Sequence, residues 1–375
     1  MKRAIYLLAA TALMASCTQS EVLVDTPNPV PEVPRSIGFD TFVDKATRAT
    51  GENSTALNDF YPAFNVYGWK TVGEETTQVF EDITVNYYDA EGTAEDGYTP
   101  GKEWGEDVAT GWYYDYVRYW DNMATAYQFS AFTPAQAKGV TCTENGTITI
   151  GTDKTPITVD PMNLLAERPQ KELAFTGFKY DYMTATSKVA ASPVTLNFQH
   201  LQAKLNIRIR LAESITTAQD VRVMTVAVHN LCDKGYYTNE EGVGVTGWQT
   251  AEPSSDYVPM VNKGFSLNTT KADDNFNNHY VLEQLIIPQT IKASTGEAPA
   301  LSEYPEACIY VEYKIGEEMF KSYSPLANIF STEDTYNFEG GKQYTLNITV
   351  GPAPIEFTAE VTSWKEGTEA EHKMD

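Results

Sequence analysis

The runs Val194-Thr195-Leu196-Asn197-Phe198 and Leu205-Asn206-Ile207-Arg208-Ile209-Arg210-Leu211 decide the fold class. In both, apolar and polar side chains alternate with a period of two. That period is typical of an antiparallel strand with one face on a core and the other in water. The same alternation recurs at residues 221–228, 309–313, 344–350 and 355–361. The second half of the chain is therefore expected to be a series of antiparallel strands.

Shorter runs extend the pattern into the first half. We expect strands at residues 37–42, 64–69, 112–120, 127–132, 147–150 and 157–159. Helical periodicity is nearly absent, although residues 164–173 and the stretch after Ser324 have room for a turn or two of helix. Many short strands without β-α-β spacing predict an all-β protein built of β-sandwiches.

The length predicts two domains. The chain has 375 residues, and single cores stop growing near ~250–300 residues. Small residues at 187–193 precede a fresh series of strands, so we place the boundary there. The expected division is a sandwich over residues 49–190 and a second over residues 191–375.

Charge excludes one large class of function. The chain carries 27 Lys and Arg against 51 Asp and Glu, a formal charge of −24. Nucleic-acid binding requires a basic face, and an anionic membrane surface repels a polyanion. We therefore expect no nucleic-acid partner. Aromatic residues make up 12% of the chain, which is enough to build a core and argues against disorder over the whole length.

The N-terminus has the features of an export signal. Lys2 and Arg3 precede an apolar stretch, residues 4–15, that is too short to span a bilayer. The sequence Leu13-Met14-Ala15-Ser16-Cys17 resembles the lipobox of bacterial lipoproteins. That resemblance implies a signal peptide at residues 1–16 and acylation of Cys17. The alternative is an ordinary signal peptide with an incidental cysteine.

A tether is expected next. Residues 18–34 are polar and contain four prolines, so they are expected to be an extended tether between the lipid and the fold.

No constellation for catalysis or metal binding stands out. Beyond Cys17, the cysteines are three and widely spaced, which suits neither a disulfide framework nor a zinc site. One bridge and three free thiols both stay open. The histidines have no metal spacing, and the chain has neither G-x-S-x-G nor H-E-x-x-H. The residues concerned are Cys142, Cys232, Cys308, His200, His229, His279 and His372. We expect no catalytic residue, cofactor or metal.

Two motif matches are weak. Gly242-x-Gly244-x-x-Gly247 fits a dinucleotide fingerprint but lacks the preceding strand and following helix. The run Asp273-x-Asn275-x-Asn277 begins like a calcium loop, yet the glycine and glutamate positions are Asn278 and Gln284. A weak calcium site near Asp273 stays open.

A cluster of aromatic side chains has two readings. One is a platform on which a glycan stacks; the other is core packing or cross-strand pairing, which is more common for aromatics on strands. The residues are Tyr113, Tyr114, Tyr116, Tyr119 and Trp120.

Several segments, in order behind the lipobox, resemble the fimbrillin family, the subunits of type V pili of Gram-negative anaerobes. They are Ile37-Gly38-Phe39-Asp40-Thr41 with Ala46-Thr47-Arg48-Ala49-Thr50, Phe64-Asn65-Val66-Tyr67-Gly68, Tyr119-Trp120, Tyr127-Gln128-Phe129-Ser130-Ala131-Phe132, Asp181-Tyr182-Met183, Val194-x-Leu196-x-Phe198-x-His200 through Ala203-Lys204-Leu205, and Ile355-x-Phe357-x-Ala359-x-Val361-x-x-Trp364. The resemblance covers nearly the whole mature chain. It implies two tandem Greek-key, transthyretin-like sandwiches.

The resemblance also implies proteolytic processing. Such subunits are exported as lipoproteins, and a surface protease cuts after an Arg beyond the first strand. The matching bond is Arg48-Ala49; Arg35 is a weaker candidate because cutting there leaves the strand attached. Cleavage at Arg48 would release residues 17–48 with the lipid anchor and the strand that contains Ile37, Phe39 and Thr41.

Loss of that strand would leave unpaired backbone groups and an apolar groove, which a strand of the next subunit can fill. Such head-to-tail addition builds a filament. The candidate donor strand contains Ile355, Phe357, Ala359, Val361 and Trp364. If this segment instead closes the second sandwich, the subunit accepts a strand without donating one, as a tip or accessory subunit would.

The expected function is therefore that of a non-enzymatic pilus subunit at the cell surface that contributes to adhesion. Its expected partners are other pilin subunits, a surface protease, the lipid anchor before processing, and a host glycan or protein as a candidate ligand. The rival is a glycan-binding lipoprotein that stays anchored and monomeric. A secreted hydrolase is disfavoured because no acid/base pair stands out.

Overall fold

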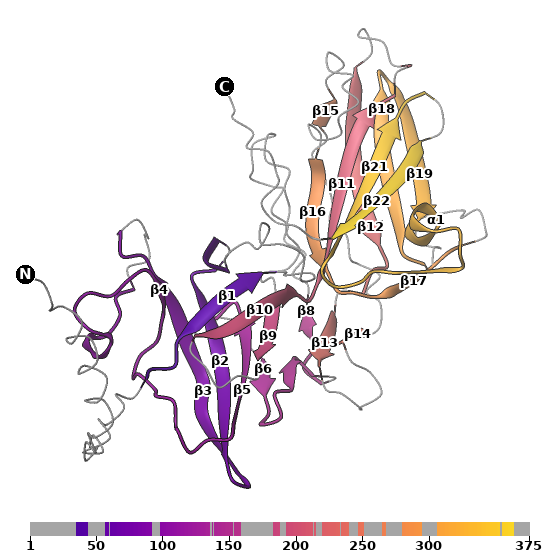
Figure 1. The fold of residues 1–375 in the computed structure, drawn as a ribbon. Helices are drawn as coiled ribbons and strands as arrows, with labels where there is room; N and C mark the ends of the chain where they lie inside the picture. The colour runs from indigo at the N-terminus through magenta and orange to yellow at the C-terminus, as the bar shows by residue number, and fades with distance from the viewer. Residues whose placement is uncertain are drawn as a thin grey trace, which may run out of the picture.

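The computed structural model describes residues 35–43, 57–59, 61–91, 98–135, 137, 139–152, 154–158, 183–187, 193–212, 214, 220–232, 234–239, 247–250, 265–267, 280–294, 306–352 and 355–363. Nearly all of the regular structure among them is β, as the sequence predicts, and it forms two sandwich units (Figure 1). No helix in this part of the chain is long and apolar enough to cross a membrane.

The first unit contains a seven-stranded sheet. Its strands, from edge to edge, are β1 (Phe39–Val43), β10 (Val194–His200), β9 (Met183–Ser187), β5 (Ala126–Thr133), β2 (Ala63–Val72), β3 (Glu75–Tyr88) and β4 (Gly111–Tyr113). All neighbours are antiparallel except β1 and β10, which run parallel. The two short 3-10 turns η1 (Leu57–Asp59) and η2 (Lys102–Trp104) lie in the connections.

A second, smaller sheet covers one face of the seven-stranded sheet. It consists of β14 (Gly247–Thr250), β13 (Lys234–Thr238), β7 (Ile148–Ile150) and β6 (Val140–Cys142), with β8 (Ile157–Thr158) beside β13. The outward rings of the large sheet, Tyr67, Trp69 and Phe132, pack against Val140 and Cys142. The main core of the unit lies on the opposite, inner face of the large sheet.

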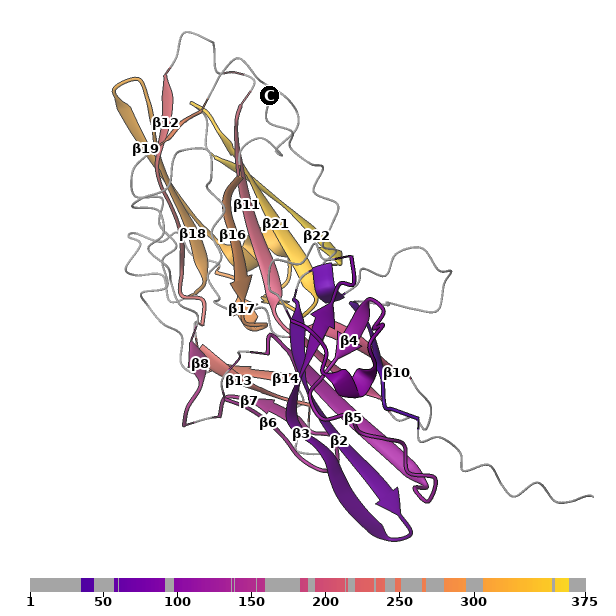
Figure 2. The ribbon, with the colours of Figure 1, turned by 90° about the vertical axis from the view of Figure 1, so that its left-hand side faces the viewer.

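The second unit is a sandwich of two four-stranded sheets. One contains β16 (Tyr280–Ile286), β11 (Ala203–Leu211), β21 (Lys342–Val350) and β22 (Glu356–Ser363). The other contains β15 (Phe265–Leu267), β12 (Val221–His229), β18 (Cys308–Ile315) and β19 (Glu318–Pro325). Figure 2 shows the two sheets facing each other. Their alternating inward side chains, such as those of Ile207, Val226, Ile309 and Leu346, form one core.

Smaller elements lie at one end of the second sandwich. The short helix α1 (Leu326–Phe330) buries Leu326 and Ala327, and β17 (Thr290–Lys292) pairs with β20 (Thr335–Asn337). The helix lies where the sequence after Ser324 predicts one; residues 164–173 lie outside the described residues.

We expect each sandwich to be one continuous stretch of the chain, but the two units are not divided in this way. The boundary that we expect at residues 187–193 precedes β10, yet β10 pairs with β1 and β9, and Val194, Leu196 and Phe198 belong to the first core. β13, which also pairs with β14, pairs with β7 and β8 of the first unit (Figure 2). Alternation shows where strands lie along the chain but not which strands they pair with. For this reason the sequence assigns β10, β13 and β14 to the wrong unit.

One further expected strand is shorter than the sequence indicates. β4 ends at Tyr113, and residues 114–120 form a connection with a single bridge between Ser36 and Tyr119. The aromatic side chains there resemble a strand pattern because several are packed into the core.

Candidate functional site

The strand β1 lies at one edge of the large sheet and pairs with one strand only. Its register with β10 runs from Phe39 opposite Val194 to Val43 opposite Phe198. The amide of Val194 donates to the carbonyl of Gly38 at 2.7 Å. A five-residue edge strand has a ladder along a single side, so few hydrogen bonds hold it.

The connection after β4 holds the start of this strand from the other side. The amide of Ile37 donates to the carbonyl of Arg118 at 2.8 Å, and the amide of Trp120 donates to that of Arg35 at 3.0 Å. The Tyr114 hydroxyl donates to the carbonyl of Ile37 at 2.8 Å. Burial raises the pKa of Tyr114 to about 12, so its hydroxyl stays protonated as a donor at neutral pH.

Arg118 supports that contact. Its Nε donates to the carbonyl of Val79 at 2.6 Å, and its guanidinium lies 5.0 Å from the ring centroid of Phe80 and 5.9 Å from that of Tyr114. Cation–π contacts of this kind are worth about 0.5–2 kcal/mol. Neither Tyr114 nor Arg118 is predicted from the sequence as a positioning residue, and the dense run of aromatics around them is the only signal that points to them.

The inward side chains of the first strand fill the centre of the core. Ile37, Phe39, Thr41 and Val43 are exposed by 0%, 4%, 6% and 5%. The Phe39 ring meets four other rings edge to face, at centroid distances of 5.5–6.0 Å: Phe64, Phe80, Tyr114 and Phe129. Removal of the strand would therefore open a deep apolar groove next to β10.

A glycine allows these rings to pack closely. A Cβ on Gly68 of β2 would lie 2.9 Å from atoms of both the Phe80 and Phe129 rings, which is closer than real Cβ contacts. Gly68 thus leaves the space in which the two rings pack against Phe39. This gives a physical reason for the glycine in the Phe64-Asn65-Val66-Tyr67-Gly68 segment.

One inward side chain fits poorly. The hydroxyl of Thr41 is buried and has no hydrogen-bond partner. A buried polar group without a partner costs about 1–3 kcal/mol. The first strand is thus well packed at Phe39 and imperfect two residues later.

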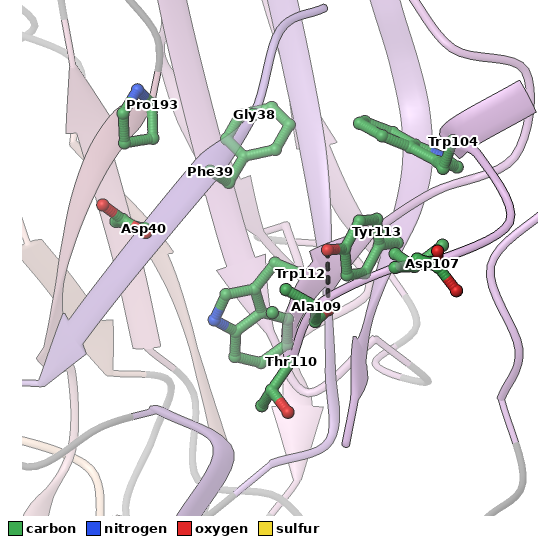
Figure 3. Close-up of a pocket in the computed structure, with 12 residues that line it drawn as sticks. Gly38, Phe39, Asp40, Trp104, Asp107, Ala109, Thr110, Trp112, Tyr113 and Pro193 are labelled. Carbon is green, nitrogen blue, oxygen red and sulfur yellow. Dashed lines mark hydrogen bonds between the residues drawn. The ribbon is translucent and has the colours of Figure 1, made fainter. Parts of the chain in front are cut away.

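A pocket of about 360 Å³ lies beside the start of β1, where Gly38, Phe39 and Asp40 line it. Figure 3 shows Asp40 and Pro193 on one side of it and Trp104, Tyr113 and Asp107 on the other. The Tyr113 hydroxyl donates to the carbonyl of Ala109 at 2.7 Å, and the Trp104 indole donates to that of Tyr114 at 2.9 Å. Both rings are thereby fixed. The lining contains the carboxylates of Asp40 and Asp107 and no Lys, Arg or His, so its charged side chains are all negative.

The candidate donor strand, β22, is an edge strand of its sheet. It pairs along its length with β21, from Lys342 opposite Ser363 to Thr349 opposite Glu356. Ile355 and Phe357 pack against the second core but remain partly exposed, and Val361 is 42% exposed. In this structure the segment closes the sandwich, which is one of the two expected roles. Trp364 lies outside the described residues.

The other predicted site residues are placed as follows. Tyr114 is buried in the core, Tyr113 lines the pocket, and Trp120 packs on Tyr127, whereas Tyr116 and Tyr119 are exposed. The five aromatics therefore do not form one platform. Cys17, Arg48, Ala49, Asp273, His279 and His372 lie outside the described residues.

Within the described part, no group of three or more His, Cys, Asp or Glu side chains is placed to hold a metal ion. Cys142, Cys232 and Cys308 are free thiols, and burial raises the pKa of both Cys142 and Cys308 to about 11. Such thiols stay protonated and unreactive at neutral pH.

Comparison with known proteins identifies the class. A sequence model of the fimbrillin-like family matches residues 47–364. The chain belongs to this family. Its membership supports the role of a pilus subunit at the cell surface, which assembles with other subunits and has a structural function. No curated protein matches.

Several solved structures are similar to most of the chain. One is a fimbrial protein from Bacteroides vulgatus, 15% identical, with 88% of this chain and 99% of that chain covered and a TM-score of 0.48. Another is a protein from Bacteroides uniformis described as a candidate for cell adhesion. It is 17% identical, the alignment covers 88% of this chain and 98% of that chain, and the TM-score is 0.45. A third is the tip fimbrial protein Mfa3 from Porphyromonas gingivalis, with C-terminal truncation: 11% identity, 81% and 94% coverage, TM-score 0.38.

Proposed function

We propose that this chain is a pilus subunit that is exported as a lipoprotein acylated at Cys17 and cut by a surface protease between Arg48 and Ala49. Cleavage frees residues 17–48, which include the lipid anchor and β1. The vacated groove then accepts a strand from another subunit. The subunits thereby join head to tail into a filament that contributes to adhesion.

The observation that carries this proposal is the placement of the first strand. It is an edge strand with a ladder on one side, yet its inward side chains are almost fully buried. A strand in this position can leave without breaking the rest of the sheet, and its departure exposes apolar pockets that only another strand fills well. Burial of such surface stabilises by roughly 25 cal/mol per Å².

The charge of the whole chain suits a subunit that does not associate with its copies before it is processed. The formal charge is −24, and like charges on subunits oppose unspecific association. Specific strand addition overcomes this repulsion because it buries apolar side chains and completes a ladder of backbone hydrogen bonds.

The test is the N-terminal sequence and intact mass of the protein sheared from the surface of its own cells. We expect a start at Ala49 without lipid, together with higher oligomers. The variant Arg48→Gln should retain the acylated N-terminus and stay monomeric. The matched control Arg35→Gln should be processed normally, because the described contacts of Arg35 involve its backbone carbonyl.

A start at acylated Cys17 in all surface material would overturn the proposal. The rival, an anchored glycan-binding lipoprotein, would then be favoured, with the pocket beside Trp104 and Tyr113 as the surface to examine first. Processing at Ala49 without oligomers would instead indicate a tip or accessory subunit, in which β22 remains in its own sheet.

A further inference from the structure

The two edge strands of the large sheet meet at the pocket beside β1. β1 is the last strand at one edge of the sheet and β4 the last at the other, yet the two strands contact each other. Residues 38–40 form one wall of the pocket, and residues 107–113, in and before β4, form another. The pocket volume of about 360 Å³ lies within the range of roughly 300–1,000 Å³ that is usual for small-molecule sites.

Two aromatic rings supply an apolar surface in this pocket. The Trp104 indole N–H donates to the carbonyl of Tyr114, and the Tyr113 hydroxyl donates to that of Ala109, so both donors are already used. The two rings lie edge to face, with centroids 5.1 Å apart and an interplanar angle of 83°. A ligand that packs on them therefore needs an apolar face of its own.

The two carboxylates of the lining face a ligand from different directions. Asp40 and Asp107 are both exposed, and Figure 3 shows them on opposite sides of the pocket. Ionised carboxylates only accept hydrogen bonds. Because these two do not converge on one point, they suit a ligand with hydroxyl donors at both edges better than a single cation. The lining has no Lys, Arg or His that would pair with an anion.

We propose that this pocket binds a neutral sugar. A sugar ring combines a face of C–H groups with hydroxyls around its edge. The C–H face would pack on Trp104 and Tyr113, and hydroxyls at opposite edges would donate to Asp40 and Asp107. Apolar walls with a few placed polar groups are typical of small-ligand sites.

One wall of this site belongs to the strand that we propose is removed. Cleavage after Arg48 would take away residues 38–40, and Asp40 with them, so the site is complete only while β1 is in place. A ligand that binds one of two states stabilises that state by the factor 1 + [L]/Kd. A bound sugar therefore retains β1 in the sheet. This second step rests on the proposed function, whereas sugar binding by the unprocessed chain does not.

Binding is tested by saturation-transfer NMR on the unprocessed chain, with the methyl glycosides of glucose, galactose, mannose and N-acetylglucosamine as probes. We expect at least one of them to bind. Asp107→Asn should weaken that binding about tenfold, because it removes a hydrogen bond to a charged group. Glu106→Gln is the matched control and should have no effect, since Glu106 is an exposed carboxylate outside the lining.

Three results would overturn the sugar site. They are no binding of any glycoside, binding that Asp107→Asn leaves unchanged, and tighter binding of methyl glucuronide or N-acetyl-arginine amide, which test an anionic and a cationic ligand. Neutral oligosaccharides from the producing cells' own surface and from mucin are compared next. The one that competes more strongly with the bound glycoside identifies the source of the sugar.

The second step is tested by cutting the purified chain with an Arg-specific protease and following release of the N-terminal segment by gel filtration and mass spectrometry. The sugar at about nine times its Kd should slow release about tenfold, and the same concentration should slow it only about twofold in Asp107→Asn. Release that ignores the bound sugar would overturn the part of β1 in the site. Failure to cut after Arg48 would instead contradict the proposed function and leave the binding result intact.

Discussion

The first strand and the C-terminal strand have nearly the same alternating side chains but opposite surroundings. β1 lies among the rings of Phe64, Phe80, Tyr114 and Phe129, whereas β22 lies at the rim of its sandwich with its apolar residues half covered. The difference shows that alternation determines which side chains lie on the apolar face of a strand. The neighbouring elements determine how much of that apolar face is buried.

Truncation of the two phenylalanines should give the largest difference. Phe39→Ala removes a ring that is 4% exposed and should cost about 3–5 kcal/mol of unfolding free energy. Phe357→Ala removes a partly exposed ring and should cost the isolated subunit much less. Urea unfolding of the unprocessed chain measures both. Equal losses of unfolding free energy would contradict the difference in burial between the two strands.

The packing around Phe39 can be disturbed without touching the strand. Gly68→Ala forces a methyl group against the rings of Phe80 and Phe129 and should cost about 1–3 kcal/mol. Gly111→Ala is the control, since its nearest contact would be an ordinary 3.5 Å to Tyr113. The same unfolding experiment applies, and a neutral Gly68→Ala would show that the rings have room to move.

The imperfection at Thr41 predicts a gain in stability. Thr41→Val keeps the shape and removes an unpartnered buried hydroxyl, so it should stabilise the unprocessed chain by about 1–2 kcal/mol. Thr133→Val is matched in burial but loses a hydrogen bond from its hydroxyl to the carbonyl of Ala63, so it should destabilise. Thermal unfolding should therefore show opposite signs for the two variants. A destabilising Thr41→Val would show that the Thr41 hydroxyl is not a defect in the packing of the first strand.

The smallest effect concerns the contact between Tyr114 and the first strand. Burial raises the pKa of Tyr114 to about 12, above the ordinary value of 10.0. The folded state therefore holds the Tyr114 proton more tightly than the unfolded state. The protonated hydroxyl contributes fully to the free energy of unfolding below pH 10, and this contribution is lost as the pH rises towards 12. Between these values the slope for this group approaches about 1.4 kcal/mol per pH unit.

Tyr114→Phe isolates that contribution from the other buried tyrosines. The variant should be less stable at neutral pH, because it loses the hydrogen bond to the carbonyl of Ile37. Its disadvantage should shrink as the pH rises above 10. Unfolding by urea at pH 8 and pH 11 measures the change, and a constant difference at both values would contradict the raised pKa of this hydroxyl in the folded state.

Much of the fold is predictable because alternation is a local property. The runs around Leu196, Ile207 and Leu346 become β10, β11 and β21, and the helix after Ser324 is found where expected. The partners of the strands are not local. The parallel pairing of β1 with β10, and the return of β13 and β14 to the first unit, depend on contacts between distant segments.

The candidate site likewise has features that the sequence predicts and features that depend on distant segments. Alternation along the sequence predicts that residues 37–42 and 355–361 are strands with one apolar face, and the structure has strands there at Phe39–Val43 and Glu356–Ser363. Contacts between distant segments place the first of these strands in the centre of an aromatic core, bring Tyr114 and Arg118 to its start and leave the Thr41 hydroxyl unpaired. Burial and hydrogen-bond partners are properties of the assembled neighbours, and no single segment contains them.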